Sequence, residues 1–197
     1  PHPFAQEMYE TIMQEFKGTW ISTPEATRLY TFFAQLISAR KILEIGTFMG
    51  YATLQLALAT PHDALIYTCE TKPEWLSKAR AYWNKAGISD KIIGMLGMAQ
   101  NTLEKLLQQH GNSFDMILID ADKMNYDCYY EQSLKLCRSG GIIILDDTLL
   151  RGRVIDDARQ DNSTHTIRTI NKKIADDHRV SHIMLPMENG ITICRKA

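Results

Sequence analysis

The sequence has 197 residues, of which 45% are hydrophobic and 23% are charged, and its formal net charge is −1. These values are typical of a soluble globular chain with a sizeable core, and they predict a single domain over residues 1–197. The near-neutral charge argues against a general nucleic-acid or anionic-membrane surface. No apolar run approaches the roughly 20 residues of a membrane span.

The spacing of the cysteines and histidines argues against a zinc site. The four cysteines form no C-x-x-C pair, and the six histidines form neither an H-x-H nor an H-E-x-x-H motif. The cysteines fall inside predicted strands or helices, which favours reduced, buried thiols and a cytoplasmic location.

Two helices are predicted before the first strand. The first carries apolar residues at helical spacing, at Phe4, Met8, Ile12 and Phe16. The second begins at the start signal Ser22-Thr-Pro-Glu25, with Pro24 in the first helical position, and runs to about Ser38. We expect its buried side to consist of Leu29, Phe32, Phe33, Leu36 and Ile37.

Strand and helix patterns then alternate along the chain. Strands are predicted at 41–45, 64–69, 91–96, 116–119 and 142–145, followed in turn by helices at 51–59, 73–86, 99–109, 126–137 and 164–177. Two closing strands at 180–185 and 190–194 form a hairpin. This order predicts an α/β fold with a mostly parallel sheet, one antiparallel strand and helices on both faces.

The connection between the first strand and the next helix contains two glycines, Gly46 and Gly50. Glycine lets the backbone turn tightly and lets a ligand approach the main chain, next to the amide groups of a helix start. The spacing is G-x-x-x-G and differs from the dinucleotide motif G-x-G-x-x-G. It favours adenosine linked to a group smaller than a pyrophosphate, although a plain βα connection can have the same pattern.

Ligands of such sheets bind beyond the carboxyl ends of the strands, so the residues that follow each strand are the candidate site. Glu44, Gly46 and Thr47 belong to the end of the first strand. Glu70 ends the second strand, where an acid can accept hydrogen bonds from ribose hydroxyls. Ala99 follows the third strand and suits an adenine. A solvent-exposed loop acid is the alternative interpretation of Glu70.

Three aspartates follow the next two strands, namely Asp120, Asp146 and Asp147. Neighbouring parallel strands lie about 4.8 Å apart, so their terminal acids can converge, and crowded carboxylates call for a cation. Oxygen ligands alone suit Mg²⁺, Mn²⁺ or Ca²⁺. The alternative is that one of the adjacent aspartates is a helix cap or loop acid.

Lys123 comes three residues after Asp120 and is a candidate general base. Burial and a nearby metal ion would lower its pKa. A surface lysine, or an ion pair with Asp122 or Asp127, is the alternative. The nearby residues Tyr126, Tyr129 and Tyr130 are interpreted as packing residues of the following helix.

Four segments together resemble one family: Leu-Glu-Ile-Gly-Thr-Phe-Met-Gly-Tyr, Ile-Asp-Ala-Asp-Lys-Met-Asn-Tyr, Gly-Gly-Ile-Ile-Ile-Leu-Asp-Asp-Thr-Leu and Leu-Pro-Met-Glu-Asn-Gly-Ile-Thr-Ile-Cys-Arg. They are similar to the S-adenosylmethionine (SAM)-dependent O-methyltransferases of the caffeoyl-CoA and catechol type. The resemblance extends from about Trp20 to Arg195. The Asp-Ala-Asp-Lys run combined with the later aspartate pair is its specific part.

The resemblance implies a Rossmann-like, seven-stranded methyltransferase sheet, a homodimer, a divalent metal ion and N-terminal helices, 1–39, that cover the pocket. Asp120, Asp146 and Asp147 would bind the metal, and Lys123 and Asp120 would be catalytic. The metal would chelate two adjacent hydroxyl oxygens of the acceptor. The donor would contact a larger set, namely Ser22, Glu44, Gly46, Thr47, Glu70, Ala99, Asp120 and Asp122.

Three positions depart from the family pattern. Asp147 stands where asparagine is usual, Ala52 replaces a serine of the donor pocket, and Leu150 replaces a tryptophan after the aspartate pair. These differences leave the acceptor open more than the reaction class.

The leading hypothesis is metal-dependent methylation of a catechol-like small molecule. Methylation of a hydroxylated tRNA base is an alternative that the net charge disfavours, and a donor-binding protein without catalysis is another. A nicotinamide dehydrogenase lacks support because the second close glycine is absent.

Overall fold

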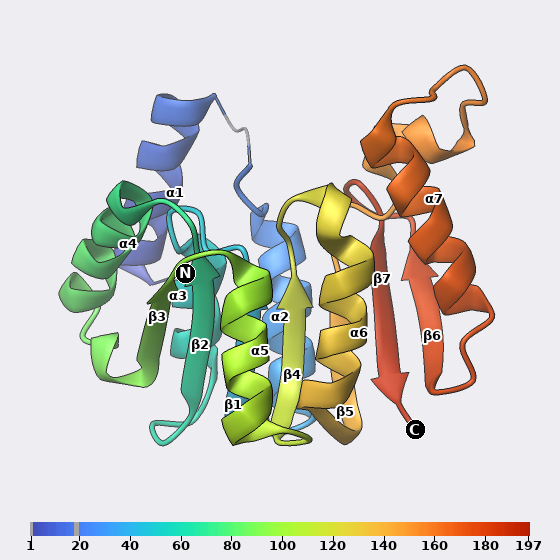
Figure 1. Ribbon diagram of the computed structural model, residues 1–197. Coiled ribbons are helices and arrows are strands. Elements are labelled where there is room, and N and C mark those ends of the chain that lie inside the picture. Colours follow the sequence, from blue (N-terminus) through green and yellow to red (C-terminus); the bar gives the residue numbers. More distant parts are fainter. Residues whose placement is uncertain (1, 18–19) are drawn as a thin grey trace. The chain divides into compact units, whose positions relative to one another are not determined.

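The computed structural model of the chain describes residues 2–17 and 20–197. By their internal contacts the residues group into two compact units, Pro1–Thr102 and Leu103–Ala197. Each unit combines parallel strands with helices, as the ribbon diagram shows (Figure 1). None of the helices in the described residues is long and apolar enough to cross a membrane.

The first unit begins with two helices, α1 (Pro3–Phe16) and α2 (Pro24–Leu36). Met8 and Ile12 of α1 are fully buried and Phe4 and Phe16 are half-buried, so the predicted apolar stripe is confirmed in its middle. The Thr23 hydroxyl accepts a hydrogen bond from the Ala26 amide at 3.2 Å and caps α2, with Pro24 as its first residue. The helix-start signal was therefore interpreted correctly.

The predicted buried side of α2 is wrong. The buried residues are Ala26, Thr27, Tyr30 and Ala34, whereas Phe32 is 58% exposed and Leu36 is 64% exposed. The helix packs against α3 (Tyr51–Ala59). The inner face thus combines three small side chains with one large one, Tyr30, while Phe32 and Leu36 lie on the outer face of α2 within this unit.

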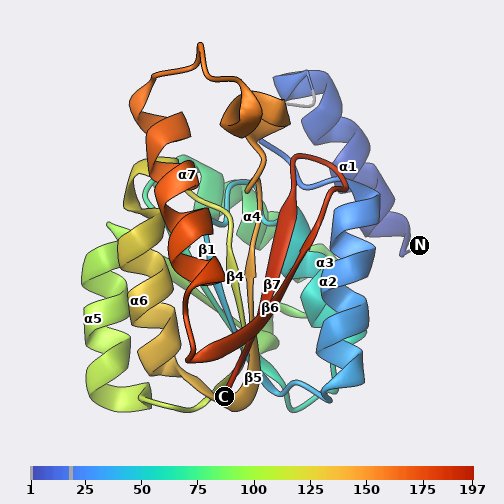
Figure 2. The ribbon, with the colours of Figure 1, turned by 90° about the vertical axis from the view of Figure 1, so that its right-hand side faces the viewer.

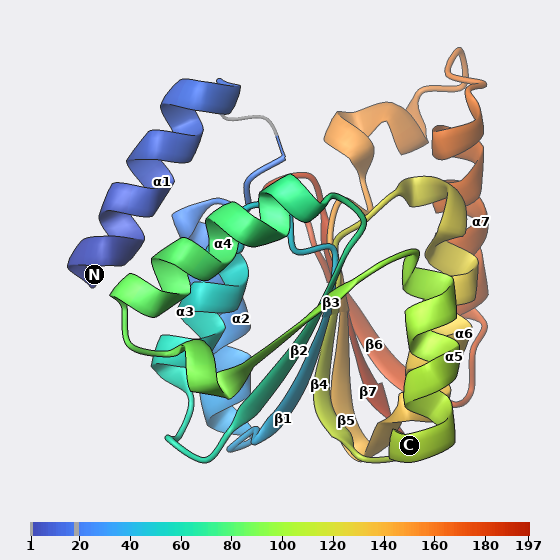
Figure 3. The same cartoon turned by 60° about the vertical axis from the view of Figure 1, so that its left-hand side comes forward.

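The strands of the first unit are β1 (Lys41–Ile45), β2 (Leu65–Glu70) and β3 (Ile92–Leu96), in the order β3-β2-β1. They are parallel and in register, with Ile45 opposite Cys69 and Glu70 opposite Leu96. Helices α2, α3 and α4 (Pro73–Lys85) lie on one side of these strands, with α1 outermost (Figure 3). The register brings the carboxyl ends of the three strands together.

The second unit contains β4 (Phe114–Ile119), β5 (Cys137–Leu145), β6 (Val180–Leu185) and β7 (Ile191–Lys196). Strands β4 and β5 are parallel, and β7 runs antiparallel to both β5 and β6. Helices α6 (Tyr126–Leu136) and α7 (Asn162–Ala175) lie on one face of these strands (Figure 2). Helix α5 (Ala99–His110) begins in the first unit and continues into the second.

Strand β5 begins five residues earlier than the predicted 142–145. Its extra residues include Gly140 and Gly141, and the pairing with β4 shifts register between Phe114 and Met116. Gly141 packs so tightly that an added Cβ would lie 2.6 Å from the Cys137 sulfur. The glycine pair therefore lies within an irregular strand start.

Three short 3-10 helices were not predicted: η1 (Ser89–Lys91), η2 (Lys123–Asn125) and η3 (Leu150–Ile155). The second one follows the Asp-Ala-Asp run directly and therefore fixes the position of Lys123. All four cysteines are free, and Cys69, Cys137 and Cys194 are buried, as expected for reduced thiols.

Candidate active site

The glycine turn at the end of β1 is held by the backbone of β2 and by one tryptophan. The amides of Gly46 and Thr47 both donate to the Cys69 carbonyl, at 3.2 and 3.0 Å. Gly50 has a φ of 81°, and a Cβ there would lie 2.7 Å from Trp83. The Trp83 indole also donates to the Gly50 carbonyl at 3.2 Å. A positive φ and this close contact together require glycine at position 50.

Glu70 ends β2, and backbone amides orient its carboxylate. Its Oε2 atom accepts from the Phe48 amide at 2.7 Å, and its Oε1 atom accepts from the amides of Thr71 and Lys72 at 2.8 and 2.9 Å. A carboxylate oxygen can accept two hydrogen bonds, so Oε2 retains capacity for a ligand hydroxyl. The structure therefore places a fixed hydrogen-bond acceptor beside the glycine turn.

Glu44 and Thr47 are joined in a buried hydrogen-bond network. The Glu44 carboxylate accepts from the hydroxyls of Thr53 and Thr68, and the Thr47 and Thr68 hydroxyls lie 2.5 Å apart. Glu44 is 1% exposed and Thr47 is 4% exposed. Glu44 therefore ties β1 to β2 and to α3. The threonine partners could not be found from the sequence, because they lie 9 and 24 residues from Glu44.

The N-terminal segment contacts the glycine turn through aromatic rings. The Phe16 ring, at the end of α1, lies 5.0 Å from the Phe48 ring, and the Trp20 ring lies 6.2 Å from it. Trp75 of α4 joins the same group at 4.7 Å from Phe48. These contacts place the segment before α2 against the turn, close in the chain to Ser22.

Ala99 lies at the start of α5 and is 8% exposed. It follows Gly97, whose amide donates to the Glu70 carbonyl at 2.8 Å and whose φ is 139°. This bond holds the loop after β3 against the end of β2. Ser22, Glu44, Gly46, Thr47, Glu70 and Ala99 all belong to the first unit.

The acids of the second unit meet at the carboxyl ends of β4 and β5. Ile119 pairs with Leu145, so Asp120 and Asp146 follow two neighbouring strands at the same level. The Asp146 amide donates to the Ile119 carbonyl at 3.0 Å, which continues the pairing. Asp147 has a φ of 59°, and its amide donates to its neighbour's Oδ1 atom at 2.7 Å. Asp120 and Asp146 therefore end neighbouring strands at one level, as predicted, whereas the convergence of all three acids on one point stays a prediction.

Lys123 lies between two of these acids. Its Nζ atom is 3.0 Å from Asp147 Oδ2 and 3.5 Å from Asp120 Oδ1. No group of three acidic, histidine or cysteine side chains in residues 2–17 and 20–197 is arranged to hold a metal ion. Two carboxylates thus converge on one cationic atom, and that atom is an ammonium nitrogen.

The neighbours of Lys123 outweigh the effect of its burial on the pKa. Burial lowers the pKa, but Tyr126, Asp120 and Asp147 raise it further, to well above the ordinary 10.5. Lys123 therefore carries its proton in this arrangement. It can act as a base only when another positive charge joins the acids and offsets their effect on the ammonium.

Tyr126 packs at the start of α6, as predicted, and its hydroxyl also contacts the candidate site residue Lys123. It is fully buried, and its hydroxyl accepts from Lys123 Nζ at 2.6 Å and donates to the Asp146 carbonyl at 3.0 Å. The phenol fixes the lysine against the end of β5. Its place three residues after Lys123, at a helix start, was the only available signal.

Asp122 is held by Tyr129 and Asn125 instead of by Lys123. The Tyr129 hydroxyl donates to Asp122 Oδ1 at 2.6 Å, and the Asn125 amide donates to Oδ2 at 2.5 Å. Asp122 is exposed, unlike the neighbouring Asp146. The proposed alternative of a Lys123–Asp122 ion pair is not observed among the described residues.

Comparison with known proteins covers the whole chain. A family model described as O-methyltransferase matches residues 2–197. A probable caffeoyl-CoA O-methyltransferase 1 of Dictyostelium discoideum is 38% identical, over 89% of this chain and 77% of that protein. Catechol O-methyltransferase domain-containing protein 1 of Mus musculus is 34% identical, over 99% of this chain and 75% of that protein.

Solved structures match over the full length. The O-methyltransferase TomG of Streptomyces achromogenes, in complex with SAM, has a TM-score of 0.91 at 26% identity, over 100% of this chain and 91% of that one. An O-methyltransferase of Bacillus cereus, in complex with SAH, has a TM-score of 0.90 at 29% identity, over 100% and 92%. The predicted α/β class with seven strands, one of them antiparallel, is confirmed for the described residues.

Proposed function

Because this chain belongs to the O-methyltransferase family, we propose that it transfers the methyl group of SAM to a hydroxyl of a catechol-like small molecule, assisted by a divalent cation. The observation that carries this proposal is the cluster at the ends of β4 and β5. There Asp120 and Asp147 both contact the Lys123 ammonium. The relatives named for caffeoyl-CoA and catechol methylation support the acceptor class.

The donor would be held by residues of the first unit. Glu70 would accept hydrogen bonds from the ribose through Oε2, in the orientation set by three backbone amides. Gly46 and Thr47 would let the donor approach the main chain, and Ala99 would contact its base. Ser22 and Glu44 complete the proposed set in this unit, and Asp120 and Asp122 of the second unit are the remaining proposed donor contacts. The ring contacts of Phe16 and Trp20 with Phe48 support a covering role for residues 1–39, within a single catalytic domain.

The side chains of the second unit fit a hard cation in their chemistry. Asp120, Asp146 and Asp147 supply only oxygen atoms, which suits Mg²⁺ above all, and also Mn²⁺ or Ca²⁺. Two of the three already direct carboxylates at a positive charge. One ammonium, that of Lys123, does not balance the negative charges of three carboxylates, so a second cation would be favoured there. When bound, it would lower the pKa of an acceptor hydroxyl and orient that hydroxyl.

Lys123 would then serve the reaction through its Nζ atom. With the acids neutralised by the cation, the lysine could release its proton and accept the one from the acceptor hydroxyl. Tyr126 would keep Nζ in place through its 2.6 Å hydrogen bond. Much of the rate would come from holding the acceptor oxygen in line with the donor methyl.

The test is methyl transfer from labelled SAM to a panel of small catechols, with Mg²⁺ or Mn²⁺ and then with EDTA. We expect transfer that EDTA abolishes and that added metal restores. Transfer unaffected by EDTA would remove the cation from the proposal. A protein that binds SAM but methylates no catechol would leave modified tRNA or a binding role as the function.

We further propose that the protein is a homodimer and cytoplasmic. The exposed Phe32 and Leu36 on α2 support a protein–protein contact, and the four free thiols support a reducing compartment. Sedimentation of the wild type and of a Phe32→Ser, Leu36→Ser double variant tests the first point. A wild type that sediments as a monomer would contradict the dimer.

A further inference from the structure

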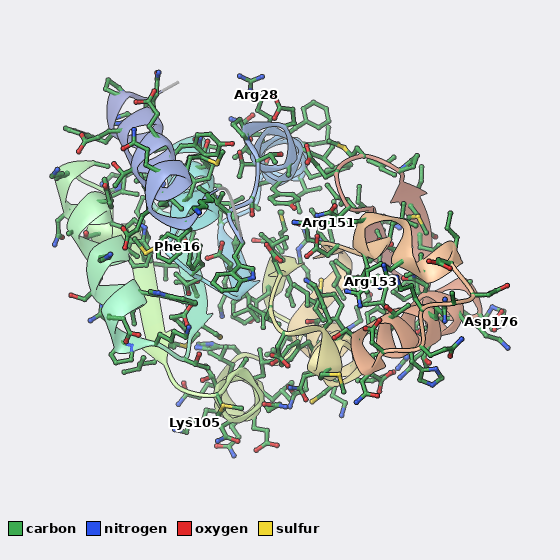
Figure 4. All side chains as sticks on the ribbon, turned by 90° about the horizontal axis from the view of Figure 1, so that it is seen from above. Phe16, Arg28, Lys105, Arg151, Arg153 and Asp176 are labelled. Carbon is green, nitrogen blue, oxygen red and sulfur yellow. The ribbon has the colours of Figure 1, made fainter. Side chains whose placement is uncertain are left out.

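A cavity of about 450 Å³ lies in the first unit, bounded by α1, α2 and α3. Its walls include Tyr9, Thr27, Arg28, Thr31, Tyr51 and Gln55. The proposed donor residues are not among those that line it. Arg28 lies on the outer side of α2, as the view from above shows, so the cavity has a solvent-facing side there (Figure 4).

The cavity has a positive charge without a counterion. Of the described residues that line it, Arg28 alone carries a charge. Among the described residues the Arg28 guanidinium makes no ion pair, whereas the exposed Arg40 of the same unit pairs with Asp63. A guanidinium presents a planar set of donors that matches a carboxylate in two parallel hydrogen bonds.

Tyr51, on α3, is a second hydrogen-bond donor in the lining of the cavity. It is only 6% exposed, and its hydroxyl oxygen accepts from the Gln55 amide at 3.0 Å. The oxygen is thus occupied as an acceptor, while the hydroxyl proton has no acceptor among the described residues. The ring of Tyr9 packs against it at 5.1 Å and holds it in place. A carboxylate held in the cavity could accept this proton, in addition to the hydrogen bond that the oxygen already has.

We propose that this cavity is a binding site for a small organic carboxylate. The ligand's carboxylate pairs with the Arg28 guanidinium and accepts the Tyr51 hydroxyl proton. Its body lies against the Tyr9 ring. A single cation and a partly apolar wall favour an organic monoanion over a bare multivalent anion. The site is additional to the methyl-transfer function and does not depend on it.

The test is an NMR titration of the full chain with benzoate, using benzamide as the neutral probe of the same shape. We expect saturable shifts from benzoate and much weaker binding of benzamide. Arg28→Ala should bind benzoate about 10- to 100-fold more weakly, because it loses a hydrogen bond between two charged groups. Tyr51→Phe keeps the ring and should weaken binding less. Arg40→Ala is the matched control and should bind benzoate like the wild type.

Three results would overturn the proposal. The first is equal affinity for benzoate and benzamide, or no saturable binding of benzoate. The second is wild-type affinity in Arg28→Ala. The third is displacement of benzoate by saturating S-adenosylhomocysteine, which would place the binding in the donor pocket. Retained benzoate binding in the presence of that compound supports a separate site.

Discussion

The two units hold their strand-end acids in different ways. In the first unit the Glu70 carboxylate accepts hydrogen bonds from the backbone amides of Phe48, Thr71 and Lys72, and no lysine or arginine pairs with it among the described residues. In the second unit Asp120 and Asp147 lie against the Lys123 ammonium. One acid is positioned by neutral donors, and the other two share a cation.

This difference matches the two kinds of ligand that we propose. Backbone amides fix a carboxylate without cancelling its charge, so Glu70 remains a strong acceptor for a neutral hydroxyl. The position of the Lys123 ammonium between two carboxylates shows that this site favours positive charge. A third acid, Asp146, lies next to Asp147 and adds negative charge there. The first arrangement suits the ribose of a donor, and the second suits a metal ion and proton transfer.

The largest loss of activity is expected from Lys123→Met. This variant removes the ammonium, so that Asp120 and Asp147 have no paired cation, as is already the case for Glu70 in the first unit. A positioned acid or base contributes about 10²- to 10⁴-fold to a rate, and we expect methyl transfer to fall by that amount. The measurement is the initial rate with saturating SAM and acceptor. SAM affinity, measured by calorimetry, should change much less.

Lys173→Met is the matched control. The Lys173 ammonium also lies between two carboxylates, Asp127 at 2.6 Å and Glu131 at 2.8 Å, but these acids are on α6 and do not follow a strand. Its removal should leave the transfer rate within about twofold, because such partly exposed pairs contribute little. Wild-type transfer by Lys123→Met would remove this lysine from the reaction.

The next effect concerns the turn after β1, whose Phe48 amide helps to position the Glu70 carboxylate. In Gly50→Ala the new Cβ meets Ala79 and Trp83 at 2.7 Å, at a φ of 81°. Strain and overpacking together should lower the free energy of unfolding by about 2–5 kcal/mol. At this chain length each 1 kcal/mol corresponds to roughly 2–4 °C in Tm.

Gly87→Ala separates strain from overpacking. Gly87 has a similar φ of 68°, but nothing lies within 4 Å of its added Cβ. The free energy of unfolding of Gly87→Ala should fall by only about 1–2 kcal/mol, which is the cost of the left-handed conformation. Equal destabilisation of the two variants would show that Trp83 does not constrain the turn.

These sites also show how far the sequence alone could lead. The positions of Glu70, Asp120 and Asp146 followed from counting to the end of each apolar strand, because ligands bind at the carboxyl ends of parallel strands. The buried face of α2 could not be predicted by hydrophobicity, since Ala26 and Ala34 are buried while Phe32 is exposed. The buried face combines these small residues with Tyr30, and a ranking by hydrophobicity does not select that set.

Contacts between residues far apart in the sequence could not be predicted either. The Thr68 hydroxyl meets Glu44 across 24 positions, and Tyr126 meets the Asp146 carbonyl across 20. Neither pairing follows from a local pattern, because both depend on strand register and on the tertiary packing of a helix against the strands. The pKa direction of Lys123 also depended on contacts of this kind.

A smaller effect is expected from Glu70→Gln, which keeps the shape of the side chain and removes its charge. A glutamine has one acceptor oxygen, so its NH₂ group would face a backbone amide that donates to Glu70 in the wild type. Loss of hydrogen bonds to a charged group should weaken SAM binding about 10- to 100-fold. Calorimetry measures this, and the EDTA response of the remaining transfer should be unchanged.

Glu74→Gln, at an exposed position in the first turn of α4, is the control and should bind SAM like the wild type. If Glu70→Gln also binds SAM with wild-type affinity, then Glu70 organises the turn without contacting the donor.

The smallest effect concerns Glu131, an acid that is held by cations but lies away from the strand ends. Hydrogen bonds from Arg179 and Lys173 lower the pKa of Glu131 from 4.5 to about 2, against the opposing effect of burial. Because the folded-state pKa is the lower one, the stabilisation is fully present above pH 4.5 and is lost as the pH falls towards 2. Glu131→Gln should therefore cost less than about 1 kcal/mol at pH 7.

The pH dependence distinguishes this charge effect from simple packing. The difference in urea-unfolding free energy between wild type and Glu131→Gln should shrink as the pH is lowered from 5 to 3, while Asp157→Asn, at an exposed acid, should show no such trend. A difference that stays constant over this range would mean that the Arg179 and Lys173 contacts do not stabilise the charged form. Methyl transfer should be unchanged in both variants, because neither Glu131 nor Asp157 belongs to the acids that follow β4 and β5.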